Sequence, residues 1–290
     1  AQVSIIEEAE QYDDLGRAKA ELARLRRQLY ETKHKHADYL ATVDQAVRDT
    51  IGAISILPVP PYKGPGGSGN DETHAVALLS DMQTGKITPD YNSDVARERT
   101  LLYADKIIDV ARKRNVKHIT VAMLGDMIEG VDIFPGQQWL IDSTLYRQVF
   151  DTTPTIIVDY IRKLLTWFDS VEIEAVQGNH GRIGRKGQFG PEDNADKMVY
   201  RIVSLLLRDE PRVIMSFADP AGERAWYKIM ELGNYRALLI HGDQIRGSMG
   251  FPWYGLGKKV HAWASGGLPD TFDDVFLGHY HQIACVPLNH

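Results

Sequence analysis

The chain has 290 residues, of which 43% are hydrophobic and 25% charged, and its formal net charge is -6. This composition is ordinary for a soluble globular protein with one substantial core, and no apolar run approaches the roughly 20 residues of a membrane span. The single cysteine, Cys285, excludes an internal disulfide framework and favours a cytoplasmic location.

Residues 1–56 form the first predicted region, an amphipathic helix with apolar residues at heptad spacing. Leu15, Leu22 and Leu29 recur every seven residues, with Ala18 and Leu25 at the second position of the repeat. Such a seam suits pairing of helices, as in a coiled coil. Two interpretations stay open: self-association or docking of a partner, and a helix folded back on its own domain.

Residues 57–73 are predicted to form a linker or a segment that lies along the surface. Prolines stiffen the first half of this segment, and glycines make the second half flexible. Residues 74–290 then alternate apolar runs with helical patterns. The early strand–helix order implies parallel pairing, and the crowded later strands imply a mixed sheet. The predicted strands are 75–79, 118–124, 171–176, 213–217, 226–232, 236–240 and 275–277, and the predicted helices are 93–113, 143–168 and 194–207. A further strand begins at Ile283, so we expect the natural domain to continue past His290.

Five short segments of this third region carry carboxylates, imidazoles or an amide, and four of them directly follow an apolar run. Their sequences are LLSDMQ, LGDMIEG, VQGNHG, LIHGDQ and LGHYHQ. Open α/β sheets collect functional side chains at the carboxyl ends of their strands. We therefore predict a site for two divalent cations. The candidate ligands are Asp81, Gln83, Asp126, Asn179, His241, His279 and His281.

The five segments, taken in order, resemble the calcineurin-like metallophosphoesterase superfamily, whose pattern is D-x-H, GDxxxG, GNH, a strand-end His-Gly and GHxH. The match extends from Leu78 to His281, and five motifs in order are far more specific than any single one. The resemblance implies an α/β fold, a four-layer α-β-β-α sandwich of mixed sheets. It also implies a phosphoesterase in which a hydroxide bridging two cations attacks phosphorus. The double-strand-break repair nucleases are the most similar branch.

The resemblance also assigns roles to individual residues. Asp126 is expected to bridge the two cations, and His180 to assist the leaving oxygen as the catalytic residue. The other ligands divide between the ions, with Asp81 and His281 on one, and Asn179, His241 and His279 on the other. Nitrogen and oxygen ligands without thiolates suit Mn first, with Mg, Fe or Zn as alternatives.

Gln83 departs from the family pattern, because it stands where the family usually has a metal-binding histidine. Two outcomes stay open. The amide oxygen of Gln83 can ligate, which would shift the preference toward Mn or Mg. Alternatively, the Gln83 amide does not coordinate the ion, and the ion at that position is weakly bound.

The segment after His180 departs a second time, since Gly181 replaces the acidic residue that often follows GNH. The loop that begins there, GRIGRKGQFG, carries Arg182, Arg185 and Lys186. Glycines allow close approach of backbone to phosphate, and the cationic side chains attract a polyanion. We predict that these three residues bind substrate, and the alternative is a solvated loop.

A second surface is predicted between His241 and Ala264, where aromatic and basic residues alternate. Aromatic faces there could stack on unpaired bases, and the alternative is that they belong to the core. The residues are Arg246, Phe251, Trp253, Tyr254, Lys258 and Lys259.

Together these features predict a DNA nuclease, of exo or endo type, as the first choice of function. Nucleic acid, DNA first, is accordingly the predicted partner. The acidic net charge favours the alternative, a phosphomonoesterase or a small-molecule or cyclic-nucleotide phosphodiesterase. The third hypothesis is a non-catalytic scaffold, which Gln83 alone supports.

Overall fold

The computed structural model describes residues 59–64, 70–184, 188–190, 193–217, 226–245 and 251–288, together with Arg24 and Gln45. The chain divides after Ser55 into two compact units, Ala1–Ser55 and Ile56–His290. Apart from those two positions, the predicted N-terminal helix lies outside the described residues, and so do Arg185, Lys186 and Arg246. Self-association or partner docking through residues 1–56 therefore stays a prediction.

Four strands form the first sheet, and all of its pairings are parallel, in the order β1-β2-β3-β4. Each strand is joined to the next by a helical crossover, which is the connection that parallel strands need. The strands are β1 (Asn70–Leu79), β2 (Val116–Met123), β3 (Ser170–Ala175) and β4 (Val213–Phe217). This sheet is parallel rather than mixed, so the expectation of two mixed sheets is wrong for it.

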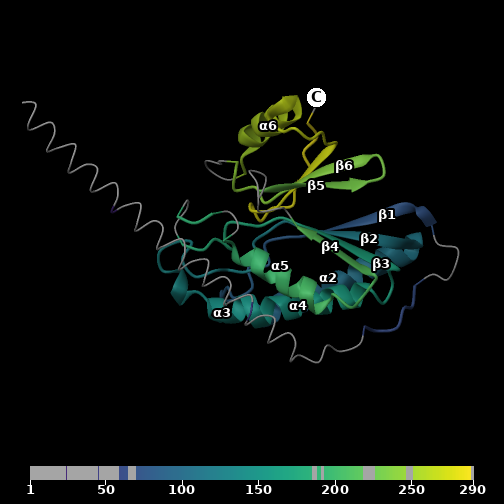
Figure 1. Cartoon of the computed structure of the whole chain (residues 1–290), viewed down its shortest axis with the longest axis horizontal. Helices are drawn as coiled ribbons and strands as arrows, with labels where there is room; N and C mark the ends of the chain where they lie inside the picture. The colour runs from purple at the N-terminus through teal and green to yellow at the C-terminus, as the bar shows by residue number, and fades with distance from the viewer. Residues whose placement is uncertain are drawn as a thin grey trace, which may run out of the picture. The chain divides into compact units, whose positions relative to one another are not determined.

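Three helices cover one face of the parallel sheet (Figure 1). They are α2 (Ser93–Arg114), α4 (Thr153–Leu164) and α5 (Ala195–Leu206). Helix α2 begins at an Asn92 cap, whose side chain accepts from the Val95 N–H, and ends at Asn115 in the left-handed conformation. No described helix is both long enough and apolar enough to cross a membrane.

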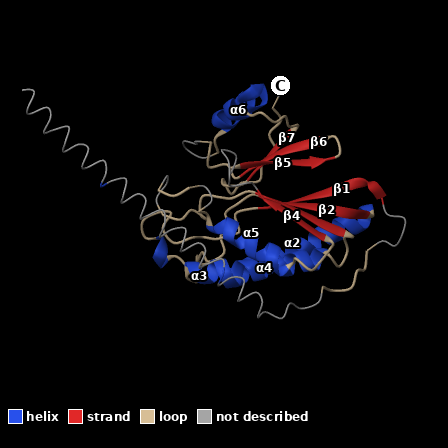
Figure 2. Cartoon of the chain, in the orientation of Figure 1, coloured by secondary structure: helices blue, strands red, loops and turns tan. Residues whose placement is uncertain are grey.

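The second sheet has three strands and is mixed, as predicted. Strands β5 (Tyr227–Leu232) and β6 (Tyr235–Ile240) form an antiparallel hairpin, and β7 (Asp274–Leu277) pairs with β6 in parallel. Helix α6 (Trp253–Ala262) lies over its outer face (Figure 2). We did not predict α6 as a helix. The strand expected from Ile283 is also absent, since residues 281–288 form neither helix nor strand and Ile283 is fully exposed.

The two sheets pack face to face, and strand β6 is buried on both sides. Its Ala237 and Leu239 pack toward Ala122 and Leu124 of the parallel sheet, whereas the alternate residue Leu238 packs with α6. Side chains of a strand alternate between its two faces, so this period-two pattern fits a strand buried between layers. The layers therefore run helices, parallel sheet, mixed sheet, helix (Figure 2). The fold is a mixed α/β sandwich.

The helix predicted for residues 143–168 is confirmed over residues 145–164, which are helical without a break. The segment contains a short helix, α3 (Leu145–Arg147), a π-helical turn, η2 (Gln148–Thr152), and then α4. Pro154 lies in the first turn of α4 and has no backbone N–H to continue an α-helical ladder from the preceding turn. Single turns also lie at Gln137–Trp139 (η1) and Trp263–Gly267 (η3).

Candidate metal centre

All the predicted ligands follow the carboxyl ends of strands. Strands β1, β2 and β3 are neighbours in one parallel sheet, and β6 and β7 are parallel neighbours in the other. Their carboxyl ends therefore meet at one edge of the sandwich. Asp81 follows β1, Asp126 follows β2, Asn179 and His180 follow β3, His241 follows β6, and His279 and His281 follow β7.

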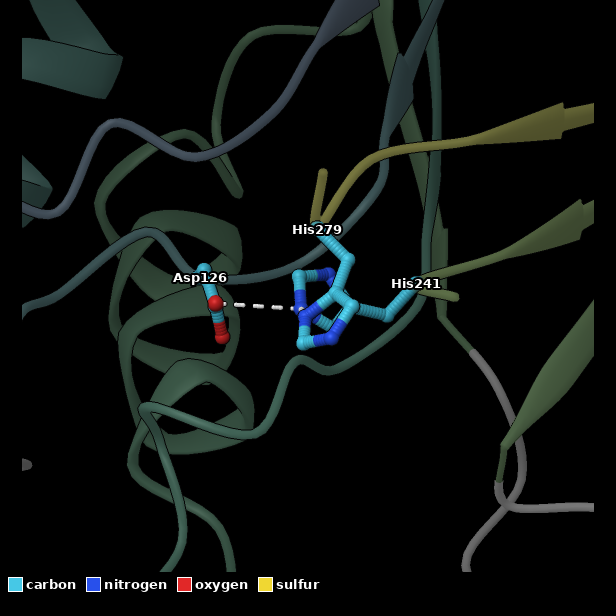
Figure 3. Close-up of side chains that lie close together, drawn as sticks. All are labelled: Asp126, His241 and His279. Carbon is cyan, nitrogen blue, oxygen red and sulfur yellow. Dashed lines mark hydrogen bonds and ion pairs between the residues drawn. The ribbon is translucent and has the colours of Figure 1, made fainter. Parts of the chain in front are cut away.

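Three of these side chains form a tight cluster at that edge. Asp126, His241 and His279 each offer a ligand atom, and these atoms lie within 4.8 Å of one another (Figure 3). The Nε2 atom of His241 lies 3.0 Å from Oδ2 of Asp126 and 3.2 Å from Nδ1 of His279. It also lies 3.1 Å from Oδ1 of Asn179.

These contacts are hydrogen bonds and an ion pair, and a divalent cation could take their place. One ring nitrogen carries at most one proton, so hydrogen bonding cannot satisfy all three neighbours of the His241 Nε2 atom. Carboxylate, amide and imidazole ligands without thiolate are a donor set for Mn, Fe or Zn. Asp126, His241, His279 and Asn179 could together hold one such ion.

His241 is oriented by its other ring nitrogen. Its Nδ1 atom lies 2.7 Å from the carbonyl oxygen of Leu124, so Nδ1–H donates there and Nε2 faces the cluster. Burial lowers the pKa of His241, but the hydrogen bond and charge of Asp126 and the charge of Asp81 outweigh it and raise the pKa to about 9. Without a cation His241 is therefore protonated at neutral pH, and a bound cation must displace that proton.

A second group of predicted ligands gathers around Asp81. The Nε2 atom of His281 lies 3.3 Å from Oδ1 of Asp81, and the backbone N–H of His279 donates to both Asp81 oxygens at 3.0 Å. Burial raises the pKa of Asp81, but hydrogen bonds from His281 and Ser80 outweigh it and hold the pKa below its usual value. Asp81 is therefore ionised and available to a cation.

Gln83 is buried beside this second group, but its amide oxygen is already engaged. Its Oε1 atom accepts from Nζ of Lys86 at 2.7 Å. Its Nε2 atom lies 3.4 Å from Nε2 of His281 and 3.3 Å from Nε2 of His180. In this arrangement the amide nitrogen, not the oxygen, faces the imidazoles.

His180 is held by Glu129 and Asp126. Its Nδ1 atom lies 2.7 Å from the carbonyl oxygen of Glu129 and 3.3 Å from a Glu129 carboxylate oxygen, and its backbone N–H donates to Asp126 at 2.7 Å. Burial lowers the pKa of His180, but Glu129 and Asp126 outweigh it and the pKa is raised. Glu129 is 1% exposed and orients His180.

Asp196 is a functional residue that we did not predict. It is fully buried on the first turn of α5 and accepts from the backbone N–H groups of Asp126 at 2.8 Å, Met127 at 3.0 Å and Gly178 at 2.9 Å. It therefore ties two ligand-bearing loops together. Burial and the charge of Asp126 raise the pKa of Asp196 to about 6.

Backbone strain is concentrated at the predicted ligands. Left-handed backbone is uncommon outside glycine, and such strain collects at functional sites. Among the described residues, the only other non-glycine position of this kind is Asn115, the end of α2. The strained ligand positions are Asp81 (φ 53°), Gln83 (φ 42°), Asp126 (φ 54°), His279 (φ 72°) and His281 (φ 52°).

Two glycines of the motifs are required by the close approach of these loops. A Cβ atom on Gly178 would lie 2.1 Å from Oδ1 of Asp126. A Cβ atom on Gly278 would lie 1.9 Å from Oγ of Ser80 and 2.5 Å from Oδ2 of Asp81. The GNH and GHxH glycines thus allow the ligand-bearing loops to meet.

The predicted substrate-binding residues are only partly described. Arg182 is half-buried, and its guanidinium donates to the carbonyl oxygen of Asn179 at 3.3 Å, which places it beside the cluster. On α6, Trp253 and Tyr254 are 61% and 82% exposed. Phe251 instead packs against the core of the mixed sheet. The core interpretation therefore holds for Phe251 and not for the two exposed aromatics.

Comparisons with known proteins add little to this geometry. No family model and no curated protein matches the chain. A solved structure of a protein of unknown function from Aquifex aeolicus aligns with 73% of this chain and 81% of its own, at 15% sequence identity and a TM-score of 0.29. A likeness at that TM-score supports no statement about function.

Proposed function

We propose that this chain is a metal-dependent phosphoesterase of the calcineurin-like type. The observation that carries the proposal is the convergence of Asp126, His241 and His279 at one sheet edge. Asn179 would complete one cation position, and Asp81 and His281 would serve a second. Bound divalent ions, Mn first, would clamp a phosphate group and lower the pKa of a water molecule.

The protein's own part in the reaction rests on His180. Glu129 fixes the Nδ1 side of this ring, which leaves Nε2 facing the cluster, 4.0 Å from Oδ2 of Asp126. Burial lowers the pKa of His180, but the hydrogen bonds and charge of Glu129 and the charge of Asp126 raise it above its usual value. His180 would then give a proton to the leaving oxygen of the ester, a contribution of about 100- to 10,000-fold in rate.

Nucleic acid, with DNA first, is the proposed substrate. Arg182 lies beside Asn179, where a cationic side chain would meet a phosphate backbone. Trp139, in the segment after Asp126, is 81% exposed, and exposed aromatic faces can stack on unpaired bases. The net charge of -6 favours the second candidate, a phosphomonoesterase or small-molecule phosphodiesterase. The small substrates of such an enzyme do not require a large positively charged surface.

The enzyme class is tested first with bis-p-nitrophenyl phosphate. We expect turnover that requires Mn and is lost in His180→Ala. Absence of turnover with every divalent metal would favour the scaffold hypothesis instead.

The substrate is tested next, with labelled single- and double-stranded DNA, RNA and phosphomonoesters. Cleavage of DNA that weakens when Arg185 and Lys186 are replaced by Gln would support the nuclease. Intact DNA beside cleaved monoesters would refute the nuclease while leaving the phosphoesterase in place.

A further inference from the structure

Lys86 determines which end of the Gln83 amide faces the cation site. Its Nζ atom lies 2.7 Å from Oε1 of Gln83. A lysine ammonium has donors only, so the amide must present its oxygen to Lys86. The amide nitrogen then points to the other side, toward Nε2 of His180 and Nε2 of His281.

The backbone holds Lys86 and Gln83 in this relation. The N–H of Gln83 donates to the carbonyl oxygen of Asp126 at 2.9 Å, and the N–H of Lys86 donates back to the carbonyl oxygen of Gln83 at 3.0 Å. Gly85 completes this turn at φ 105°, and a Cβ atom there would lie 2.4 Å from the Gln148 side chain. The turn therefore returns the Lys86 side chain to Gln83.

We propose that Lys86 is a positioning residue that keeps the Gln83 oxygen away from the cations and makes the two cation positions unequal. The inference rests on the proposed dimetal function. A cation needs lone pairs, which Asp126, His241 and His279 offer at the first position. At the second position, beside His281, Gln83 presents N–H groups instead. The first ion is therefore held tightly and the second weakly.

Titration of the intact chain with MnCl₂ by isothermal calorimetry, with elemental analysis of bound Mn, tests this inference. Wild type should show two classes of site with unequal affinity. Lys86→Met should tighten the weaker class by about tenfold or more, because the freed amide can turn its oxygen inward. Lys86→Leu is a second variant without a donor and has the same expectation. Lys106→Met, an exposed lysine on α2, is the matched control and should change neither class.

A double-mutant cycle separates amide orientation from simple loss of charge. In a Gln83→Ala background, Lys86→Met should change the weaker class by only about threefold, the effect of a partly exposed charge. An equal effect in both backgrounds would show that Lys86 acts through its charge alone and would overturn the inference.

Two other results separate the inference from the proposed function. Two sites of equal affinity in wild type would overturn the inference and leave the dimetal function standing. No Mn binding by a folded wild-type protein would refute the dimetal function, and the inference with it.

Discussion

Raising the pH of the cation-free protein should destabilise it, because His241 holds its proton more tightly in the folded chain. The pKa of His241 is raised from 6.5 to about 9. At about 1.4 kcal/mol per pKa unit, this rise corresponds to about 3–4 kcal/mol of stability. The folded state binds the extra proton, so this stability is full below pH 6.5 and is lost as the pH rises through about 9. Asp196, with a pKa of about 6, titrates mostly below that window.

The assay is thermal or urea unfolding in EDTA between pH 6 and pH 9. For a chain of this size, about 3–4 kcal/mol corresponds to a fall of about 6–16 °C in Tm. In His241→Gln, most of the fall in stability with rising pH should disappear. A smaller fall should remain, because the pKa of His180 is also raised. His261→Gln, an exposed histidine on α6, should keep the full slope. A wild-type stability that stays flat or rises with pH, or an undiminished slope in His241→Gln, would refute the reasoning.

Three substitutions follow from the same geometry. His180→Ala should lower Mn-dependent turnover by about 100- to 10,000-fold. The amount of bound Mn, measured by elemental analysis, should not change. Loss of Mn together with activity would contradict a purely catalytic role. Gly178→Ala should cost about 1–3 kcal/mol in urea unfolding, since the added carbon meets Asp126, whereas Gly257→Ala on α6 should not destabilise. Asp196→Ala leaves four backbone N–H groups without their acceptor and should cost about 3 kcal/mol or more in urea unfolding. Wild-type stability in this variant would show that the loops are held in another way.

The alternation of strands and helices was predictable because it depends on local patterns. Strands β2 and β6 end in continuous apolar runs, VAM and ALLI, and the strand–helix order in the first part of the domain implies parallel pairing. Features that depend on single residues were missed. Helix α6 was hidden by Gly255 and Gly257, which weaken a helical pattern.

The convergence of the candidate ligands was predictable because each follows the end of a strand, where the fold gathers side chains. The residues that support them were not. Asp196 lies in the first turn of α5, where an acidic residue is expected for the helix dipole alone. Lys86 has the sequence context of an ordinary surface lysine. Only the tertiary fold brings the Asp196 carboxylate to the backbone N–H of Asp126 and the Lys86 ammonium to the amide oxygen of Gln83.

Anomalous scattering from crystals grown with MnCl₂ tests the central claim most directly. We expect a manganese peak coordinated by Asp126, His241 and His279, with a second peak beside Asp81 and His281. Bound manganese located elsewhere, with these side chains left joined by hydrogen bonds alone, would contradict the account.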